Sequence, residues 1–291
     1  MIKEIIDKLV ALLAVSALLA SCSESELWQN PQTEARDGYI MLNFKTEIPA
    51  MQEVVTRAVD PDGGGVQDMT LFCFDSYGLF ISTVKAGVTV QKPGPGEMEG
   101  TFKAEVPENT RTIHFLANQN MDEFKEDSFR NKSESEVMAV LEGSSGRMIY
   151  WGRFACDAGN DSNIAEQMAT SGNSVKLIRN HARISVDNPD NNGHIVITGF
   201  AVCNTNAFGT VAPHHPKKGF DFTWPSSDDP FVTLPVNDAK MSDITDVTSS
   251  MNQYVFECEN SADAPVSVIL RGHLPDQDEE KYYRVLLVDD K

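Results

Sequence analysis

The feature that most constrains the fold is a two-residue alternation of apolar and polar side chains in short runs. It begins at residues 39–45, where Ile40, Leu42 and Phe44 fall on one face of an extended chain. Comparable runs follow at 69–84, 100–117, 147–154, 174–188, 194–205, 253–260, 265–272 and 281–290. Because successive side chains of a strand point to opposite faces, the pattern predicts half-buried strands. Short strands with turn signals about every ten residues predict an all-β chain with β-sandwich architecture.

Turn and helix signals interrupt the alternation at defined places. The segment Asp75–Gly78 ends in a glycine that can take the positive φ of a tight hairpin turn. Ser133 and Glu136 have the spacing of a capping box, so we expect a short helix there, ended by Gly143. A further turn of helix is expected at 164–168. The sequence therefore predicts one or two short helices beside the strands.

The longest stretch without periodicity is 207–250, which is rich in Pro, Asp, Gly, Ser and Thr. Long polar connections in β domains usually run over the surface, and they often carry function. We therefore expect this stretch to be a surface elaboration of the β-structure.

Composition narrows the class of protein and of partner. The chain has 291 residues, of which 41% are hydrophobic, enough for two ordinary domains or one large β domain with a substantial core. It carries 43 acidic against 24 basic residues, a formal net charge of -19 at pH 7. Such a surface repels the phosphates of nucleic acid. Nucleic-acid binding is therefore excluded, and the acidity suits an exported domain that must stay dispersed.

The N-terminus has the pattern of an export signal. Leu9–Ala20 is an apolar run with one polar break, too short for a membrane span of about 20 residues but suited to a signal peptide. The sequence LASC, ending at Cys22, resembles the bacterial lipobox. That resemblance predicts cleavage between Ser21 and Cys22, and acyl chains on the cysteine. Ser23–Glu26 resembles the acidic tag that directs lipoproteins of Bacteroidales to the outer surface.

A search for catalytic and metal-binding patterns finds none that is specific. The sequence contains no GxSxG, HExxH or Walker A motif, and no GxGxxG between a strand and a helix. The adjacent His214 and His215 point in different directions on an extended chain and rarely share a metal ion. We therefore expect no enzyme, no catalytic residue, no metal and no cofactor apart from the lipid on Cys22.

Four further cysteines carry little chemical signal: Cys73, Cys156, Cys203 and Cys258. No CxxC occurs among them, so a zinc site of the usual kind is not predicted. Cys73 and Cys258 lie in apolar, strand-like runs, which favours buried thiols. A disulfide among the four stays open, because exported proteins meet an oxidising environment.

The order of several motifs resembles the fimbrillin superfamily of Bacteroidales, which comprises lipoprotein pilins and their tip and anchor proteins. The resemblance spans residues 18–291 and rests on the order of the motifs rather than on any one of them. After the lipobox come VTRA (55–58), FCFDSYG (72–78), VPENTRTIHFLANQN (106–120), IYWGRF (149–154), KLIRNHARISV (176–186), YVFECEN (254–260) and ILRGHLPDQDEEKYYRVLLVD (269–289).

The resemblance implies a particular domain organisation. Two tandem transthyretin-like β-sandwich domains would occupy 38–180 and 181–291, with 177–186 crossing between them. A signal peptide (1–21) and an acidic tether (22–37) would precede them. The family pattern commonly continues past the last strand with a further segment, whereas this sequence stops at Lys291. Two interpretations stay open here, a truncated C-terminal domain and a divergent accessory protein.

The resemblance also implies a mode of assembly. In such pilins a trypsin-like protease removes an N-terminal strand after an arginine, and a strand of the next subunit fills the groove by strand addition. Here 39–45 would be the strand removed, with the cut at Arg57-Ala58 or at Arg36-Asp37. The implied function is a structural or adhesive part of a fimbrium, anchored by lipid to the outer membrane at the cell surface. Its partners would be other fimbrial subunits, outer-membrane lipid, and host or bacterial surface ligands.

An alternative function is a surface glycan-binding lipoprotein of a nutrient-uptake system. Such a protein would expose an aromatic platform, for which Trp151, Trp224 and Tyr254 are the candidates. Trp151 and Tyr254 lie in strand patterns typical of a core, whereas Trp224 lies in a loop. Trp224 is therefore the predicted glycan contact if this alternative holds. A hydrolase with an unrecognised site is a third hypothesis.

Overall fold

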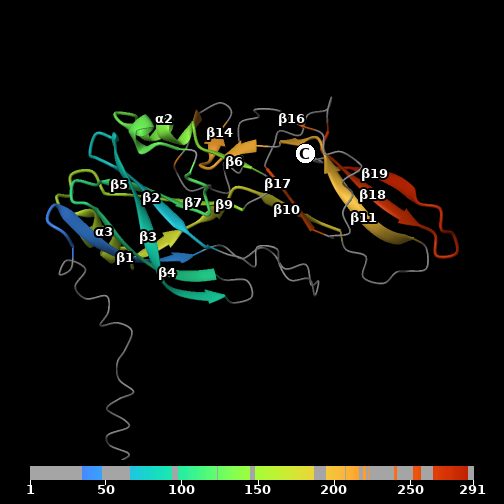
Figure 1. The fold of residues 1–291 in the computed structure, drawn as a ribbon, viewed down its shortest axis with the longest axis horizontal. Coiled ribbons are helices and arrows are strands. Elements are labelled where there is room, and N and C mark those ends of the chain that lie inside the picture. The colour runs from blue at the N-terminus through green and yellow to red at the C-terminus, as the bar shows by residue number, and fades with distance from the viewer. Residues whose placement is uncertain are drawn as a thin grey trace, which may run out of the picture.

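The described residues fold mostly into β-strands, as the alternation predicts (Figure 1). The computed structural model describes residues 35–47, 66–93, 98–122, 124–144, 148–186, 195–206, 208–215, 219–220, 222, 239–240, 252–256 and 265–287. Within these ranges, no helix is long and apolar enough to cross a membrane. The all-β fold class is confirmed.

Eight strands form the first part of the molecule, in the spatial order β8-β1-β4-β3-β2-β5-β7-β9. Neighbouring strands are antiparallel except for β1 and β8, which are parallel. The strands are β1 (Tyr39–Glu47), β2 (Met69–Phe74), β3 (Phe80–Pro93), β4 (Met98–Pro107), β5 (Thr112–Ala117), β7 (Tyr150–Ala155), β8 (Ser174–Lys176) and β9 (Ile178–Arg179).

Two segments pass from one layer of this sandwich to the other. Strand β3 pairs with β2 as far as Ala86 and with β4 from Gly87 onward. At the opposite side, β8 pairs with β1 whereas β9 pairs with β7, and the buried Leu177 lies between them. The two layers are therefore joined at both sides. The apolar core between them draws on β1 and β4 from one layer and on β2, β5 and β7 from the other.

The central strands β2 and β5 are buried at every residue because both of their faces are covered. Leu71 and Phe115 point into the core between the layers. Phe72 and Leu116 point the opposite way, into a second apolar cluster on the outer face of the sheet. A strand covered on both faces reads as a continuous apolar run, which accounts for the MTLFCF sequence of β2.

Short helices accompany the strands in the part of the chain that the structure describes: α2 (Glu134–Met138), α3 (Ile164–Thr170) and the 3-10 helix η3 (Glu126–Phe129). The predicted capping box is present, since Ser133 and Glu136 bond each other reciprocally at the start of α2. The prediction that Gly143 ends this helix is wrong, because α2 ends at Met138. Gly143 lies in a short strand, where an added Cβ would be 2.6 Å from Nδ2 of Asn180. Close packing therefore accounts for this glycine.

The second part of the molecule consists of smaller sheets. Strands β11 (Val196–Cys203), β18 (Ser267–His273) and β19 (Lys281–Leu286) form one sheet, and β10 (Ala182–Ser185) pairs with β17 (Asn252–Val255). Phe200, Val202, Val266 and Val268 form their shared core. The chain leaves the first sandwich after Arg179 and enters the second part at Ala182. The division into two domains at residue 181 stays a prediction.

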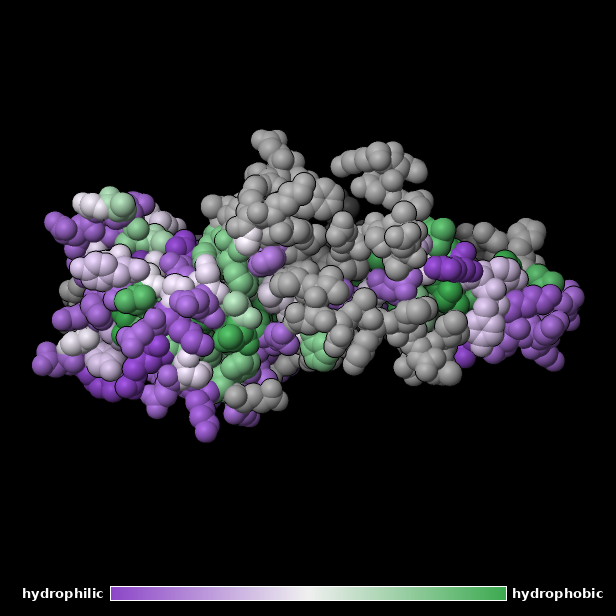
Figure 2. All heavy atoms as spheres, turned by 90° about the horizontal axis from the view of Figure 1, so that it is seen from above, coloured by the Kyte–Doolittle hydropathy of each residue, from purple (hydrophilic) through white to green (hydrophobic). Residues whose placement is uncertain are grey.

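Part of the stretch 207–250 packs against the first sandwich. Strand β13 (Phe208–Thr210) pairs with β6 (Glu142–Ser144), and Val211, Ala212, Phe220 and Phe222 join the outer-face cluster. The remaining short pairs are β12 (Thr205–Asn206) with β16 (Ala239–Lys240) and β14 (His214–His215) with β15 (Gly219–Phe220). Figure 2 shows a band of apolar side chains on the side of the first sandwich that faces the second part. The expected surface elaboration is therefore wrong for these residues.

Candidate functional site

Strand β1 lies between β4 and β8 and has an incompletely paired edge. It pairs with β4 over eight consecutive positions, from Tyr39 opposite Pro107 to Thr46 opposite Gly100. On its other edge, β8 pairs only with Lys45–Glu47. Among the described strands, none pairs with the edge of β1 from Tyr39 to Phe44. The predicted strand is thus confirmed, and over most of its length β4 is its one described neighbour.

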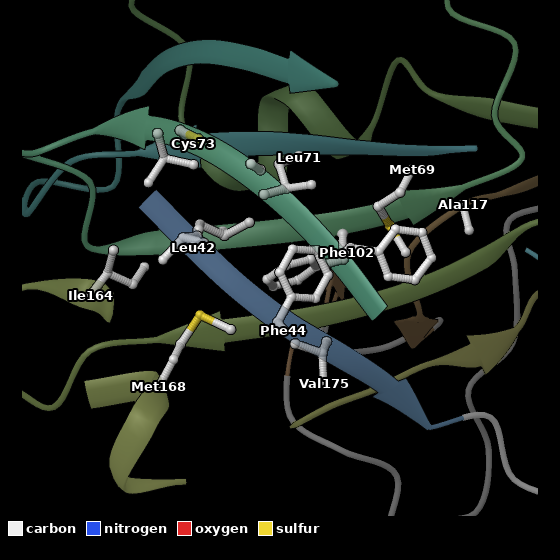
Figure 3. Packing of buried hydrophobic residues seen from close by; sticks show 14 of the residues in the cluster. Leu42, Phe44, Met69, Leu71, Cys73, Phe102, Ala117, Ile164, Met168 and Val175 are labelled. Carbon is white, nitrogen blue, oxygen red and sulfur yellow. The ribbon is translucent and has the colours of Figure 1, made fainter. Parts of the chain in front are cut away.

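The inward face of β1 carries Ile40, Leu42, Phe44 and Thr46, all buried. Figure 3 shows Leu42 and Phe44 directed into the core, with Met168 of α3 and Val175 of β8 nearby. The Phe44 ring stacks on Phe102 at 5.5 Å between centroids and meets Phe115 edge-on at 5.0 Å. Each fully buried side chain of this kind contributes about 1.5–3 kcal/mol to folding. Most of what holds β1 is therefore its apolar face together with the β4 ladder.

Arg36, one of the two predicted cleavage positions, lies on the exposed turn before β1. Its Nε is 2.6 Å from Oε2 of Glu105, and its guanidinium lies over the Tyr39 ring at 4.3 Å from the centroid. The side chain is nevertheless 67% exposed. A cut at Arg36-Asp37 would leave β1 attached to the chain that follows it. Only a cut after β1 could free the strand.

Several other predicted site residues lie outside the described residues. They are Ser21, Cys22, Arg57, Ala58 and Trp224. The lipid attachment, the signal cleavage, the cut after Arg57 and the glycan contact therefore stay predictions.

The most concentrated polar chemistry is a hydrogen-bond network around the fully buried His114, which we call the His114 network. Nδ1 of His114 accepts a hydrogen bond from Nε1 of Trp151 at 3.0 Å. Nε2 then carries the proton and donates to Oε2 of Glu134 at 2.8 Å. Arg153 donates to the same carboxylate, from Nε at 2.7 Å and from its terminal amino group at 3.2 Å. The network joins β5, β7 and the start of α2.

The environment sets the charges in this network. Burial lowers the pKa of His114, so its ring is neutral at pH 7. Burial alone would raise the pKa of Glu134, but hydrogen bonds from His114 and Arg153 outweigh it and lower that pKa to about 2. A general base needs one free nitrogen facing a reactant. Both nitrogens of His114 are occupied, so this arrangement positions α2 on the sheet.

A second buried histidine, His181, lies between β9 and β10 at the joint between the two parts. Its ring lies 4.0 Å from the Phe256 ring, and its Nδ1 is 2.7 Å from Oδ1 of Asn180. The same oxygen accepts a hydrogen bond from the Ile149 backbone N–H at 3.1 Å. Burial lowers the pKa of His181 to about 4. Sequence patterns had singled out neither histidine, because each acts through residues distant in the chain.

Of the aromatic candidates for glycan binding, the structure describes the surroundings of Trp151 alone. Trp151 is buried and bonded to His114, so its predicted place in the core is confirmed. Tyr254 lies in β17, the strand that its pattern predicts. Of the three candidates, the structure thus removes Trp151 as a surface contact.

The three cysteines that the structure describes show no sign of a reactive site. Cys73 and Cys203 are buried, and burial raises the pKa of the Cys73 thiol to about 12. Cys156 is partly exposed, and its pKa is also raised by burial. Cys258 lies outside the described ranges. Within those ranges, no group of His, Cys, Asp and Glu side chains has the arrangement of a metal site.

Comparison with known proteins identifies the fold. No family model and no curated protein matches the chain. A candidate cell adhesion protein from Parabacteroides distasonis is similar in structure, with a TM-score of 0.50 and 14% identity over 84% of this chain and 80% of that one. The tip fimbrial protein Mfa3 from Porphyromonas gingivalis, truncated at its C-terminus, also has a TM-score of 0.50, with 13% identity over 86% and 82%.

The fold is therefore that of bacterial cell-adhesion and fimbrial proteins of known structure. The fold implied by the motif order in the sequence agrees with the fold found by comparing structures. At these identities the likeness establishes the fold alone.

Proposed function

We propose that the chain is a structural and adhesive component of a cell-surface fimbrium, joined to its neighbours by strand addition. The observation that carries this proposal is the place of β1. It is a nine-residue strand with an apolar inward face, and one full-length partner holds it. It lies between the predicted tether and the predicted cut after Arg57. The likeness in fold to an adhesion protein and a fimbrial tip protein supports the same role.

Loss of β1 would create a strong acceptor for another strand. The edge of β4 that pairs with β1 would lose its hydrogen-bonding partner along eight positions. Buried side chains such as Phe102 and Phe115 would then be exposed to water. An unpaired edge beside an apolar surface binds an added strand through main-chain hydrogen bonds and alternate side chains. A strand from the next subunit would restore both kinds of contact.

The predicted lipid and the predicted cut would then act in sequence. Acyl chains on Cys22 would hold the acidic chain at the outer membrane, since stable anchoring takes more than one chain. Cleavage after Arg57 would separate the anchor and β1 from the rest of the molecule in one step. The partners would be other fimbrial subunits, which bind during assembly, and host or bacterial surface ligands, which bind the assembled fimbrium. The likeness in fold to adhesion and fimbrial proteins supports a role without catalysis.

Limited trypsin digestion of purified residues 22–291 carrying Cys22→Ser tests the assembly step. We expect the cut chain to release the segment that contains β1 and to form multimers or take up a labelled β1 peptide. Arg57→Ala should abolish both results, whereas the matched Arg36→Ala variant should retain them. Mass spectrometry identifies the cut and size-exclusion chromatography the assemblies. A chain that is cut after Arg57, stays monomeric and takes up no strand would contradict the proposal.

Immunogold electron microscopy on the native bacterium tests the cellular role. Antibody against this chain should label filaments along their length, at their ends or at their base. Deletion of the gene should change the filaments or remove the label. Unlabelled filaments that the deletion leaves unchanged would count against a fimbrial role.

A further inference from the structure

We propose that the position of Phe44 sets the register of any strand that occupies the place of β1. A strand that replaces β1 in an assembly must then bring a large aromatic side chain to this position and a small one to the position of Thr46. This inference rests on the proposed exchange of β1, and it specifies the chemistry of the incoming segment.

The place of Phe44 is shaped for an aromatic ring. Its register partner across the ladder is Phe102, whose ring is nearly parallel to it at an interplanar angle of 17°. Phe115 from the opposite layer closes the other side at 64°. Phe44 is fully buried, and Figure 3 shows its ring beside that of Phe102. Such offset-stacked and edge-on pairs add about 0.5–1.5 kcal/mol to the burial of the ring itself.

The next inward position is narrow. Thr46 is fully buried opposite Gly100, and its Oγ1 has no hydrogen-bond partner among the described residues. A Cβ on Gly100 would lie 2.5 Å from Cε2 of Phe102 and 3.4 Å from Oγ1 of Thr46. The Phe102 ring therefore lies over Gly100, against the place of Thr46. A large side chain brought to this place would displace the Phe102 ring.

These two neighbouring positions distinguish the registers that alternation alone leaves equivalent. A slip by one residue would bury Lys45 and expose Phe44, which the cost of burying a charge excludes. A slip by two residues keeps the apolar face inward, so alternation does not oppose it. Such a slip would instead place Leu42 or Thr46 opposite Phe102, in the position that Phe44 occupies. The Phe44 ring would move to a neighbouring position that is not shaped for an aromatic side chain. The aromatic side chain thus selects one register among those that differ by two residues and keep the apolar face inward.

The direction of the incoming strand follows from its two neighbours. It must run antiparallel to β4 and parallel to β8. Backbone bonds from Lys45 N to Asn173 O at 2.8 Å and from Leu177 N to Glu47 O at 2.8 Å fix the end beside β8. The aromatic residue should therefore come two positions before the small one in the direction of the chain.

A strand-uptake experiment tests this inference. A site for a sequence-specific protease inserted after Arg57 allows β1 to be severed after the chain has folded. Labelled peptides spanning 36–48 are then offered at urea concentrations below the unfolding midpoint. The set comprises the natural sequence, Phe44→Ala, the double exchange Leu42→Phe with Phe44→Leu, and the matched surface control Tyr39→Ala. The double exchange keeps the composition and the alternation and moves only the aromatic ring.

We expect Phe44→Ala to weaken uptake on the order of 100- to 1,000-fold, the scale of losing a buried aromatic side chain. Tyr39→Ala should bind within about threefold of the natural peptide, since surface changes are small. Register is read from a disulfide between Asn43→Cys in the peptide and Lys103→Cys in the chain, which are partners in the native ladder. The natural peptide should form this crosslink. The double-exchange peptide should bind weakly or lose the crosslink.

Two outcomes would overturn the inference, and they differ from each other. Equal uptake and equal crosslinking of all four peptides would remove the register role of Phe44 and leave strand exchange intact. Failure of every peptide, the natural one included, would overturn the proposed exchange and the register role with it.

Discussion

The indole N–H of Trp151 donates a 3.0 Å hydrogen bond to Nδ1 of His114, between neighbouring strands on the outer face of the first sandwich. This contact leaves Nε2 of His114 to hold Glu134 at the start of α2. Phe222, from the second part of the chain, packs edge-on against His114 at 4.7 Å between ring centroids. One buried ring thus connects the sheet, a helix and the segment that returns from the second part.

Stability should fall as pH drops from 6.5 to 4. Burial lowers the folded-state pKa of His181 from 6.5 to about 4, and it lowers that of His114 as well. The neutral ring is the stable form in the folded state, so its contribution is complete above pH 6.5 and is lost on acidification. For His181 the loss reaches about 3 kcal/mol at pH 4. Urea unfolding at a series of pH values measures it.

A His181→Gln variant provides the control for that measurement. It should flatten the fall between pH 6.5 and 4 while retaining the part due to His114. Glu134 adds to the fall below pH 4.5, because its pKa is lowered from 4.5 to about 2. The two histidines are therefore compared between pH 6.5 and 4.5. An unfolding free energy that is constant between pH 7 and 4.5 would contradict the prediction.

Glu134→Gln should destabilise the fold by about 2–4 kcal/mol. The change leaves Arg153 without its carboxylate, and an unpaired, partly buried charge is costly. The matched control is Asp127→Asn, which breaks the exposed Asp127–Arg130 pair and should cost less than about 0.5 kcal/mol. Urea unfolding midpoints of the two variants make the comparison. Similar losses in both would show that the His114 network contributes little.

Phe222→Ala should loosen the contact between the returning segment and the first sandwich. The ring packs on His114 and lies 5.6 Å from the Arg153 guanidinium carbon, so its removal opens the outer-face cluster. We expect faster amide exchange in Phe208–Thr210, the strand paired with β6. Tyr77→Ala, at an 86% exposed hairpin tip, serves as the control and should leave this exchange unchanged. Unaltered protection of β13 in Phe222→Ala would rule out the anchoring role of Phe222.

Gly152→Ala should destabilise the fold, whereas Gly87→Ala should be tolerated. A Cβ at Gly152 would lie 2.5 Å from the Lys176 carbonyl oxygen, beneath the segment that joins β8 to β9. Backbone atoms must shift to accommodate it, at a cost of about 1–3 kcal/mol. A Cβ at Gly87 meets nothing closer than 3.8 Å. Thermal unfolding of the two variants tests the difference, and equal melting temperatures would disprove it.

Features set by residues close together in the chain were predictable. Strand β2 occupies Met69–Phe74, and the hairpin turn has Gly78 at a φ of 72° with Asp75 accepting from the N–H groups of Tyr77 and Leu79. The capping box of α2 and the apolar face of β1 were predictable for the same reason. The expected helix end at Gly143 failed because distant atoms, those of Asn180 and Ile149, fill the space beside it.

By itself, the sequence determined that this chain is all-β and which residues of β1 face inward. The export signal, and the cut that the family resemblance implies at Arg57-Ala58 or at Arg36-Asp37, stay predictions. Only the tertiary structure decided which strands flank β1, that β3 belongs to both layers, and that Phe222 covers His114. Alternation and capping depend on contacts within a few residues, and they leave a pattern that can be read along the chain. Strand order and the fit of Phe44 against Phe102 depend on residues about sixty positions apart, which compositional patterns do not link.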